Sequence, residues 1–406
     1  MRLATTATGN EDCAMKNSYK VQGSAALSAF EAPPKKRHRT GALQNLRAAV
    51  WFSEREWNSP LRSILHEPAW LSASICKLVV LALLVLSCTG RATASSIGSE
   101  DRTTVIIVVG APGDAEYGTN FLKQAAAWQK ACLQGDARSI TVGLDSSGAT
   151  NDYDLLKQTI ACQPEQGLAQ LWLVLIGHGT FDGKEARFNL RGPDVSASDL
   201  ANWFKTFRRP LAVIDASAAS GPFLNKLSAT NRVIITATRS GSEQSFARFG
   251  QYFADALTDP QADLDHDGQV SLLEAFLTAS RQTSESYKLQ GRLVTEHPLL
   301  EDNGDGLGTP PDWFRGLRAT KKASDGASPD GLLAQQFRLI PNPEERNLSP
   351  EQIAQRDALE RAVLLHREKK SQMPEEDYYR ELEALLVQLA RCYSVSNSVG
   401  NSAAAP

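Results

Sequence analysis

The sequence has few of the features that assign a chain directly to a class of proteins. It holds only six cysteines, none in the C-x-x-C spacing of a zinc or redox site, and the three beyond residue 95 (Cys132, Cys162 and Cys392) are an odd number. Basic residues (43) nearly balance acidic ones (46), so the net charge does not indicate nucleic-acid binding. These absences argue against a fold built on disulfides or zinc, and against a nucleic-acid partner.

The first 94 residues are expected to be a leader that precedes the folded part of the chain. The longest apolar run, residues 78–86, is short for a membrane span and typical of the hydrophobic region of a signal peptide. Small residues at 92 and 94 suit a signal peptidase, and Cys88 ends a stretch that resembles a lipoprotein cleavage box. If Met1 is the true start, residues 78–86 would instead anchor the chain in a membrane. Either alternative predicts an exported protein (periplasmic, secreted or membrane-anchored).

Residues 103–290 alternate between strand-like and helix-like stretches. Apolar runs of strand length begin at Thr104, Leu171, Leu211 and Arg232. Helical patterns with one apolar face lie between them, as in 117–133. Strands that alternate with helices predict an α/β fold with a mostly parallel sheet covered on both faces, which is a three-layer sandwich.

The C-terminal part, from residue 320 onward, differs from 103–290 in composition and in its helical patterns. Residues 320–345 are rich in Pro, Gly, Ser and Asp and predict a linker. Residues 346–393 carry two helical patterns separated at Pro374, which predict a helical hairpin that packs on itself, on the sheet domain or on a helical partner. Residues 394–406 are rich in Ser, Asn and Ala and predict a disordered tail.

Two apolar strands end in residues that could carry chemistry. His178 and Gly179 follow the strand that begins at Leu171, and Asp215 and Ser217 follow the one that begins at Leu211. The carboxyl ends of neighbouring parallel strands meet in one crevice, where ligands of open α/β sheets bind. We therefore expect these side chains to lie together, with the histidine as a proton shuttle and the Gly179 N–H as an oxyanion donor.

This pair of strand ends resembles the His-Gly and acid-Ala-Cys motifs of legumain and other caspase-like cysteine peptidases. Residues 236–245, Thr-Ala-Thr-Arg-Ser-Gly-Ser-Glu-Gln-Ser, resemble the segment that forms the specificity wall of legumain-like enzymes. The resemblance covers about 103–290 and implies a caspase-like domain at 95–319. It also implies that Asp215 and three residues of the wall bind substrate; these are Arg239, Ser240 and Glu243.

The sequence departs from that family at the nucleophile. Counted forward from Asp215, the cysteine position holds Ser217; counted backward from Ser220, it holds Ala218. A serine is a far poorer nucleophile than a thiolate unless a base activates it, and an alanine cannot act at all. The first expectation is therefore a degenerate, non-catalytic homologue that binds a peptide or protein. The alternatives are an active endopeptidase that uses Ser217 with His178, and a calcium-stabilised scaffold.

A second motif lies in residues 263–274. Oxygen-bearing residues recur there at the ligand positions of an EF-hand calcium loop, and Gly268 stands where the loop must turn sharply. The candidate Ca²⁺ ligands are Asp263, Asp265, Asp267, Gln269 through its carbonyl, Ser271 and Glu274. Residues 301–306, Glu-Asp-Asn-Gly-Asp-Gly, repeat the acidic half of this loop and form a weaker candidate, because Pro310 and Pro311 interrupt the helix that should follow.

Overall fold

The computed structural model describes residues 102–144 and 151–400. The expected leader, with its apolar run 78–86 and Cys88, lies outside the described residues, as does the end of the expected tail at 401–406. Among the helices of the described ranges, none has the length and apolar character needed to cross a membrane.

A six-stranded sheet forms the centre of the domain, in the order β2-β1-β3-β7-β8-β9. The first five strands are parallel, and β9 pairs antiparallel with β8 at one edge. Strands β1, β3, β7 and β8 begin at the residues predicted from the apolar runs. Their bounds are β1 Thr104–Val109, β2 Arg138–Val142, β3 Leu171–Ile176, β7 Leu211–Asp215, β8 Arg232–Thr236 and β9 Leu299–Glu301.

The two faces of this sheet carry separate hydrophobic cores, because successive side chains of a strand point to opposite faces. In β1, Val105 and Ile107 belong to one core and Ile106 and Val108 to the other. Strand β3 divides in the same way, with Trp172 in the first core. Strands buried on both faces need a continuous apolar sequence, which is what these runs supply.

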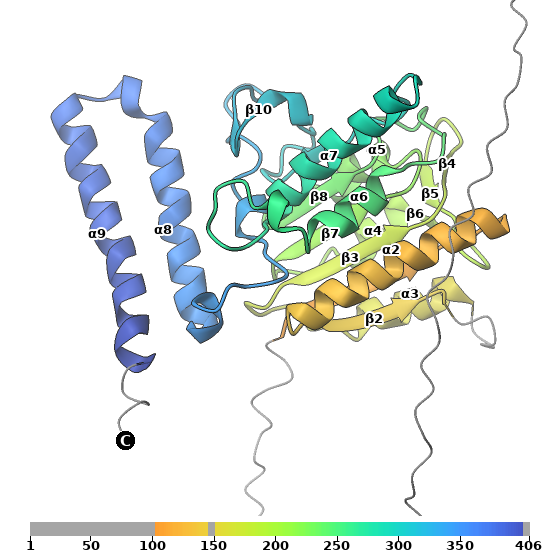
Figure 1. Cartoon of the computed structure of the whole chain (residues 1–406), viewed down its shortest axis with the longest axis horizontal. Coiled ribbons are helices and arrows are strands. Elements are labelled where there is room, and N and C mark those ends of the chain that lie inside the picture. Colours follow the sequence, from red (N-terminus) through yellow and green to blue (C-terminus); the bar gives the residue numbers. More distant parts are fainter. Residues whose placement is uncertain (1–101, 145–150, 401–406) are drawn as a thin grey trace, which may run out of the picture. The chain divides into compact units, whose positions relative to one another are not determined.

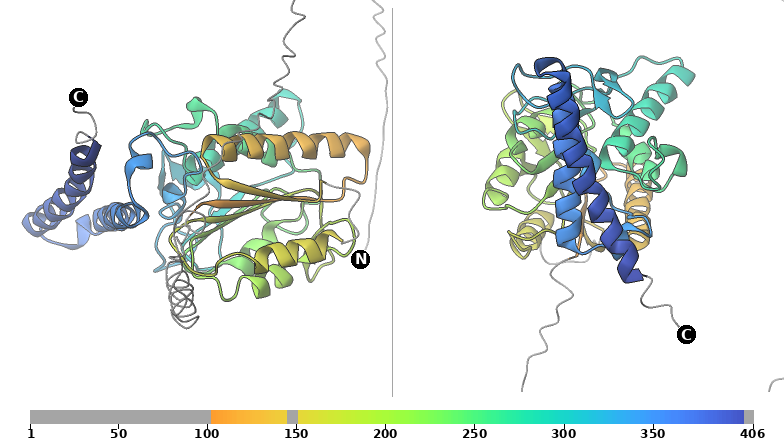
Figure 2. Two further views of the ribbon diagram at one scale, coloured as in Figure 1. Left: turned by 90° about the horizontal axis from the view of Figure 1, so that it is seen from below. Right: turned by 90° about the vertical axis from the view of Figure 1, so that its left-hand side faces the viewer.

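Helices cover both cores, so the domain is a three-layer α/β sandwich, and the predicted fold class is confirmed. Figure 2 shows the sheet between the two helical layers, with α2 on one side and α3 on the other. The first core is covered by α2 (Ala115–Gln134), α6 (Phe249–Ala256) and α7 (Leu272–Leu289). The second core is covered by α3 (Asp152–Ala161), α4 (Ala197–Trp203) and α5 (Gly221–Leu227).

Short elements complete the domain. Strands β4 (Gly179–Phe181), β5 (Ala186–Phe188) and β6 (Val195–Ser196) form a small antiparallel sheet directly after His178. A two-stranded ribbon, β10 (Phe314–Arg315) and β11 (Arg318–Ala319), follows β9. The 3₁₀ turns are η1 Pro260–Ala262, η2 Pro311–Trp313, η3 Ala334–Gln336, η4 Glu345–Asn347 and η5 Lys370–Gln372.

The segment expected as a linker, 320–345, is packed in its second half. Leu333, Ala334, Phe337 and Leu339 belong to the first hydrophobic core, and Leu272 N donates to the Phe337 carbonyl. The composition of the segment favoured a linker because its polar first half outweighs these few apolar residues. Burial of those apolar side chains decides its state, which makes this part of the chain integral to the domain.

Two helices follow as a hairpin, α8 (Pro350–Glu368) and α9 (Glu375–Gly400), with the break at the predicted proline (Figure 1). His366 of α8 stacks on Tyr378 of α9, with ring centroids 4.8 Å apart, and its Nε2 lies 3.0 Å from the Tyr378 carbonyl. Helix α9 continues to Gly400, into the stretch expected as a tail. Extending an existing helix is easier than starting one, so weak helix formers can still be helical there.

Candidate functional site

His178 lies at the point where the chain order of the sheet reverses. Strand β1 has β2 on one side and β3 on the other, and His178 follows β3 by two residues. Its Nε2 lies 3.2 Å from the Pro112 carbonyl oxygen, in the loop after β1. Because a carbonyl can only accept, this contact makes Nε2 the protonated ring nitrogen. The histidine therefore bridges two strand ends at the position where α/β sheets commonly bind ligands.

An aromatic cluster surrounds the imidazole. The ring of Tyr117 meets it edge-on at 4.8 Å between centroids, Phe121 at 5.2 Å and Phe246 at 6.3 Å. Tyr117 and Phe246 also contact one another, at 5.0 Å. His178, Tyr117 and Phe246 are half-buried, whereas Phe121 belongs to the core. The sequence reasoning missed Tyr117 and Phe246 as site residues, because they come from α2 and from the loop before α6.

The His-Gly loop and the end of β7 are in direct contact, as expected from the motif spacing. Gly179 is buried, and a Cβ at this position would lie 2.7 Å from Ser217 Oγ and overlap the Ala218 carbonyl oxygen. Only a residue without a side chain fits this approach. The structure therefore brings the proposed oxyanion donor and both candidate nucleophile positions, Ser217 and Ala218, to one point.

Ser217 is nevertheless engaged elsewhere. Its side chain has 0% exposure, and its hydroxyl donates to Asp215 Oδ1 at 2.6 Å. The Ser217 backbone N–H donates to the same oxygen at 3.0 Å. Asp215 is also fully buried, and its Oδ2 has no hydrogen-bond partner. Burial raises the pKa of Asp215 to about 6, although the two bonds from Ser217 act in the opposite direction.

These contacts do not join Ser217 to His178. A nucleophilic serine needs a base within hydrogen-bond reach and must be open to substrate. Here the Ser217 hydroxyl is buried against Asp215, and the contact of His178 Nε2 with Pro112 leaves Nδ1 as the ring nitrogen that can accept. Ala218, the other candidate position, has no reactive group. These hydrogen bonds stabilise the loop after β7, and none of them links the Ser217 hydroxyl to the imidazole.

The ends of β7 and β8 are joined by a second pair of hydroxyls. Ser220 Oγ and Thr238 Oγ1 are 3.0 Å apart, and both side chains are fully buried. The Thr238 N–H donates to Ser220 Oγ, and the Gly221 N–H donates to Thr238 Oγ1. These bonds satisfy polar groups that would otherwise be buried without partners. They also hold the start of the 239–245 segment beside the loop that joins β7 to α5.

Glu243, expected to bind substrate, is saturated by contacts within the protein. Its carboxylate accepts from Nδ1 of His297 at 2.6 Å and from the His297 backbone N–H at 3.1 Å. It also accepts from the Arg239 N–H and pairs with Arg239 Nε, both at 3.1 Å. Ser240 Oγ lies 2.8 Å from Ser242 Oγ. The carboxylate thus fixes the segment to the strand β9 region, while the Arg239 side chain remains largely exposed.

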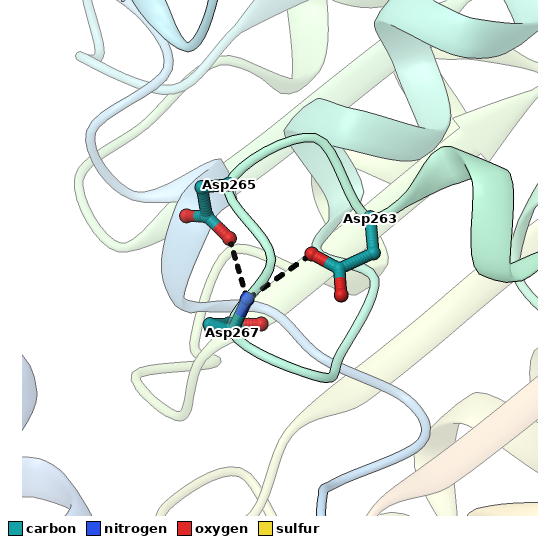
Figure 3. A group of neighbouring side chains, drawn as sticks. All are labelled: Asp263, Asp265 and Asp267. Atoms are coloured by element: carbon teal, nitrogen blue, oxygen red, sulfur yellow. Dashed lines mark hydrogen bonds between the residues drawn. The ribbon is translucent and has the colours of Figure 1, made fainter.

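The loop expected to bind calcium brings three carboxylates together. Ligand oxygens of Asp263, Asp265 and Asp267 all lie within 4.8 Å of one another, as Figure 3 shows for the side chains. Two oxygens on one Ca²⁺ ion can be at most about 5 Å apart, because each Ca–O bond is about 2.3–2.6 Å. The three carboxylates therefore fit around one such ion. The Asp267 N–H lies between Asp263 Oδ1 and Asp265 Oδ1, at 3.2 and 3.3 Å.

Glu274 organises the same loop from its C-terminal end. It is buried, and its Oε2 accepts from the Ser271 N–H and hydroxyl, which completes a capping box on α7. Its Oε1 accepts from the Leu264 N–H at 2.8 Å and the Asp265 N–H at 3.3 Å. Ser271 and Glu274 thus close the loop on itself.

Burial and neighbouring charges act on the carboxylates of this loop. Burial, and next the Glu274 carboxylate, raise the pKa of Asp265, and burial raises that of Asp267 despite Arg338. Asn342 ties the loop to the packed C-terminal segment, since its N–H donates to Gln269 Oε1 and its side chain to the Asp267 carbonyl, both at 3.1 Å. No local pattern marks Asn342 or Arg338 as part of this loop, because both lie about 70 residues away in the sequence.

No protein-family model matches the chain, and no curated protein matches it significantly. Among solved structures it is similar to the Drosophila initiator caspase Dronc, with 16% sequence identity and a TM-score of 0.33. The match covers 52% of this chain and 85% of that chain. A likeness of this degree assigns no residue a role. The closer relation to legumain stays a prediction.

Proposed function

We propose that this protein is an exported, non-catalytic relative of caspase-fold peptidases that binds an unfolded peptide or protein segment and is stabilised by Ca²⁺. One observation carries the non-catalytic part: the Ser217 hydroxyl has 0% exposure and donates to Asp215. The Ser217 hydroxyl is thus closed to substrate, whereas His178 keeps Nδ1 as an acceptor because its Nε2 faces the Pro112 carbonyl. The hydroxyl contributes to the stability of the β7 loop, and its chemistry is not used.

The binding part rests on the surface around His178. Tyr117 and Phe246 are half-buried aromatic side chains in contact with each other and with the imidazole. Aromatic groups with partial exposure and a nearby polar group are the usual anchors of protein recognition. Arg239 adds an exposed cation on a neighbouring strand end. An extended segment with apolar and acidic side chains is the partner that this chemistry fits.

Calcium belongs to the proposal through the fit of the three aspartates around one ion. Bound Ca²⁺ would neutralise the carboxylates of the 263–274 loop, which connects α6 to α7. Through Asn342 the loop also contacts the packed C-terminal segment. A stabilising role suits an exported protein, because a metal that binds only the folded state adds to its stability.

Fluorescein-labelled casein, an unfolded and acidic protein, provides the test. The expected result is a rise in fluorescence anisotropy without cleavage, and at least a fivefold weaker interaction for Tyr117→Ser and for Phe246→Ser. Tyr379→Ser is the matched control, because Tyr379 is an exposed aromatic residue of α9. Unchanged affinity in both aromatic variants would refute the binding surface.

The same samples address the active-enzyme alternative. A fluorophosphonate probe labels activated serines, and none of the wild-type protein should react. Cleavage of casein that is lost in both His178→Ala and Ser217→Ala would show an active serine peptidase and overturn the proposal. A scaffold without a binding crevice would give neither an anisotropy change nor cleavage.

A further inference from the structure

The acidic turn that follows β9 has the same ligand spacing as the 263–274 loop. Glu301, Asn303 and Asp305 occupy the first, third and fifth positions, as the three aspartates do in the first loop. The Asp305 N–H donates to Asn303 Oδ1 at 2.8 Å, and the Leu307 N–H donates to Asp305 Oδ1 at 2.8 Å. Oxygen-bearing side chains at this spacing can converge on one side of a turn.

The backbones of the two turns also agree. The fourth position has a left-handed conformation in both, with φ of +61° at His266 and +86° at Gly304. The sixth position does as well, with φ of +83° at Gly268 and +75° at Gly306. Glycine at the second loop's fourth position adopts this conformation without the strain that His266 bears.

A fully buried carboxylate with an unpartnered oxygen lies at the start of the second turn. Glu301 has 0% exposure, and its Oε1 accepts from the Gly304 N–H at 2.6 Å. Its Oε2 is buried and has no hydrogen-bond partner, and the same holds for Asp305 Oδ2. The Ser228 hydroxyl acts to lower the pKa of Glu301, yet it forms no hydrogen bond of normal geometry. Buried carboxylate oxygens without donors are costly unless a proton or a cation is present.

Two further buried acids lie near Glu301. Asp302 and Asp330 are nearly inaccessible, and the Asp302 N–H donates to Asp330 Oδ1 at 3.2 Å. Burial raises the pKa of Glu301 to about 7, and burial together with the Asp302 carboxylate raises that of Asp330 to about 7. No ion pair among the described residues involves Glu301, Asp302, Asp305 or Asp330.

A buried acid elsewhere in the chain differs from these acids because it has a cationic partner. Glu345 is similarly buried and its Oε2 also lacks a hydrogen-bond partner, but its Oε1 lies 2.9 Å from Arg356 Nη2. Burial alone would raise its pKa, and the contacts with Arg356 outweigh burial, so that the pKa of Glu345 is lowered. The acids around Glu301 have no such cationic partner among the described residues.

We propose that Glu301, Asn303 and Asp305 form a second Ca²⁺ site, separate from the 263–274 loop. An all-oxygen set of this kind matches the preference of Ca²⁺ for hard ligands. Asn303 Nδ2 donates to the Ser328 carbonyl at 2.9 Å, and the Asp302 carboxylate accepts from the N–H groups of residues 331, 333 and 334. The ion would thus fasten the packed segment after residue 328 to the edge strand β9.

Calorimetric titration of the full-length protein with CaCl₂ tests this site independently of the first. Wild-type protein should bind two Ca²⁺ ions, and the Glu301→Gln/Asp305→Asn variant should bind one. An Asp263→Asn/Asp265→Asn variant should also bind one and retain the site at Glu301. Asp152→Asn is the matched control, because Asp152 is a buried acid paired with Arg191; it should keep both ions.

Thermal unfolding of the same variants separates binding from folding. Without Ca²⁺, Glu301→Gln/Asp305→Asn should melt at the wild-type temperature or above, since it removes buried charge and keeps the side-chain shapes. With Ca²⁺, part of the wild-type rise in melting temperature should be missing. Two bound ions in the Glu301→Gln/Asp305→Asn variant would overturn the second site. Loss of binding only in the Asp263→Asn/Asp265→Asn variant would instead show that the first loop is the sole site, which also refutes the second.

Discussion

Ser217 donates its hydroxyl proton to Asp215 Oδ1 at 2.6 Å, and neither side chain has any exposed surface. A residue that stands where a nucleophile is expected therefore serves as the hydrogen-bond donor to a buried acid. The pair fixes the turn between β7 and α5, and its properties can be measured without any substrate.

Replacing Ser217 by alanine should destabilise the fold. The change removes one of two donors to a buried carboxylate, and the loss of such a bond costs about 1–3 kcal/mol. Urea denaturation measures the free energy of unfolding. Ser242→Ala is the control, because Ser242 is exposed and its loss should change stability by less than about 0.5 kcal/mol. Equal effects of the two substitutions would show that the buried bond is not important.

Asp215 should make stability depend on pH in a defined direction. Its pKa is raised from 3.8 to about 6 in the folded state, mainly by burial. Between these values the folded protein holds a proton that the unfolded chain has released, so the free energy of unfolding increases as the pH falls through this window. The contribution is at most about 3 kcal/mol, since one pKa unit corresponds to about 1.4 kcal/mol.

The Asp215→Asn variant isolates this contribution. The amide keeps the shape and an acceptor for Ser217, but it does not titrate. The stability of the wild-type protein relative to Asp215→Asn should therefore rise as the pH is lowered from about 7 to about 4. A difference that stays constant over this range would mean that the folded-state pKa of Asp215 is normal.

Gly179→Ala should be strongly destabilising, because the added methyl group would overlap the Ala218 carbonyl oxygen and approach Ser217 Oγ to 2.7 Å. Both neighbours are buried, so relief requires a backbone shift, and we expect a loss of about 2–4 kcal/mol. Gly118→Ala in α2 is the control, since a Cβ there meets its nearest atom at 3.3 Å. That change should lie within about 1 kcal/mol of wild type.

Glu243→Gln should loosen the segment that follows β8. The substitution replaces a charged acceptor of four contacts from Arg239 and His297, and hydrogen bonds to charged groups are worth about 1.5–3 kcal/mol. Hydrogen exchange of residues 239–246 should accelerate. Glu285→Gln, which removes an exposed pair with Arg281, should cost less than about 0.5 kcal/mol. If the two variants exchange alike, Glu243 does not anchor the segment.

Calcium at the first loop should raise thermal stability. At a free concentration one hundred times the dissociation constant, one ion adds about 2.7 kcal/mol, which corresponds to several degrees in melting temperature. Asp267→Asn should reduce that gain, whereas Asp255→Asn, an exposed acid of α6, should leave it intact. Differential scanning fluorimetry with CaCl₂ and with EDTA provides the comparison. An identical calcium response in both variants would exclude Asp267 as a ligand.

Much of the sheet could be predicted from the sequence, because the apolar runs that begin at Thr104, Leu171, Leu211 and Arg232 have the length and composition of buried strands. Strand β9 could not be predicted in this way, since it has three residues and is recognised only by its pairing with β8. The packed segment around Phe337 was expected as a linker, because its apolar residues are too few to outweigh the polar composition before them.

The candidate site was predictable only in part. The meeting of His178, Gly179 and Ser217 follows from strands of known direction in one sheet. The partners that decide their chemistry come from distant segments: Pro112 for His178, His297 for Glu243 and Asn342 for the first acidic loop. No local pattern encodes such contacts.

The sequence by itself determined the alternating layers, the place of each strand end and the two acidic turns, because these depend on periodicity and on residue spacing within a short stretch. Only the tertiary structure decided that the Ser217 hydroxyl is buried against Asp215 and that Glu301 keeps an unpartnered oxygen. Burial and hydrogen-bond partners depend on which segments pack together, and that is a property of the whole fold.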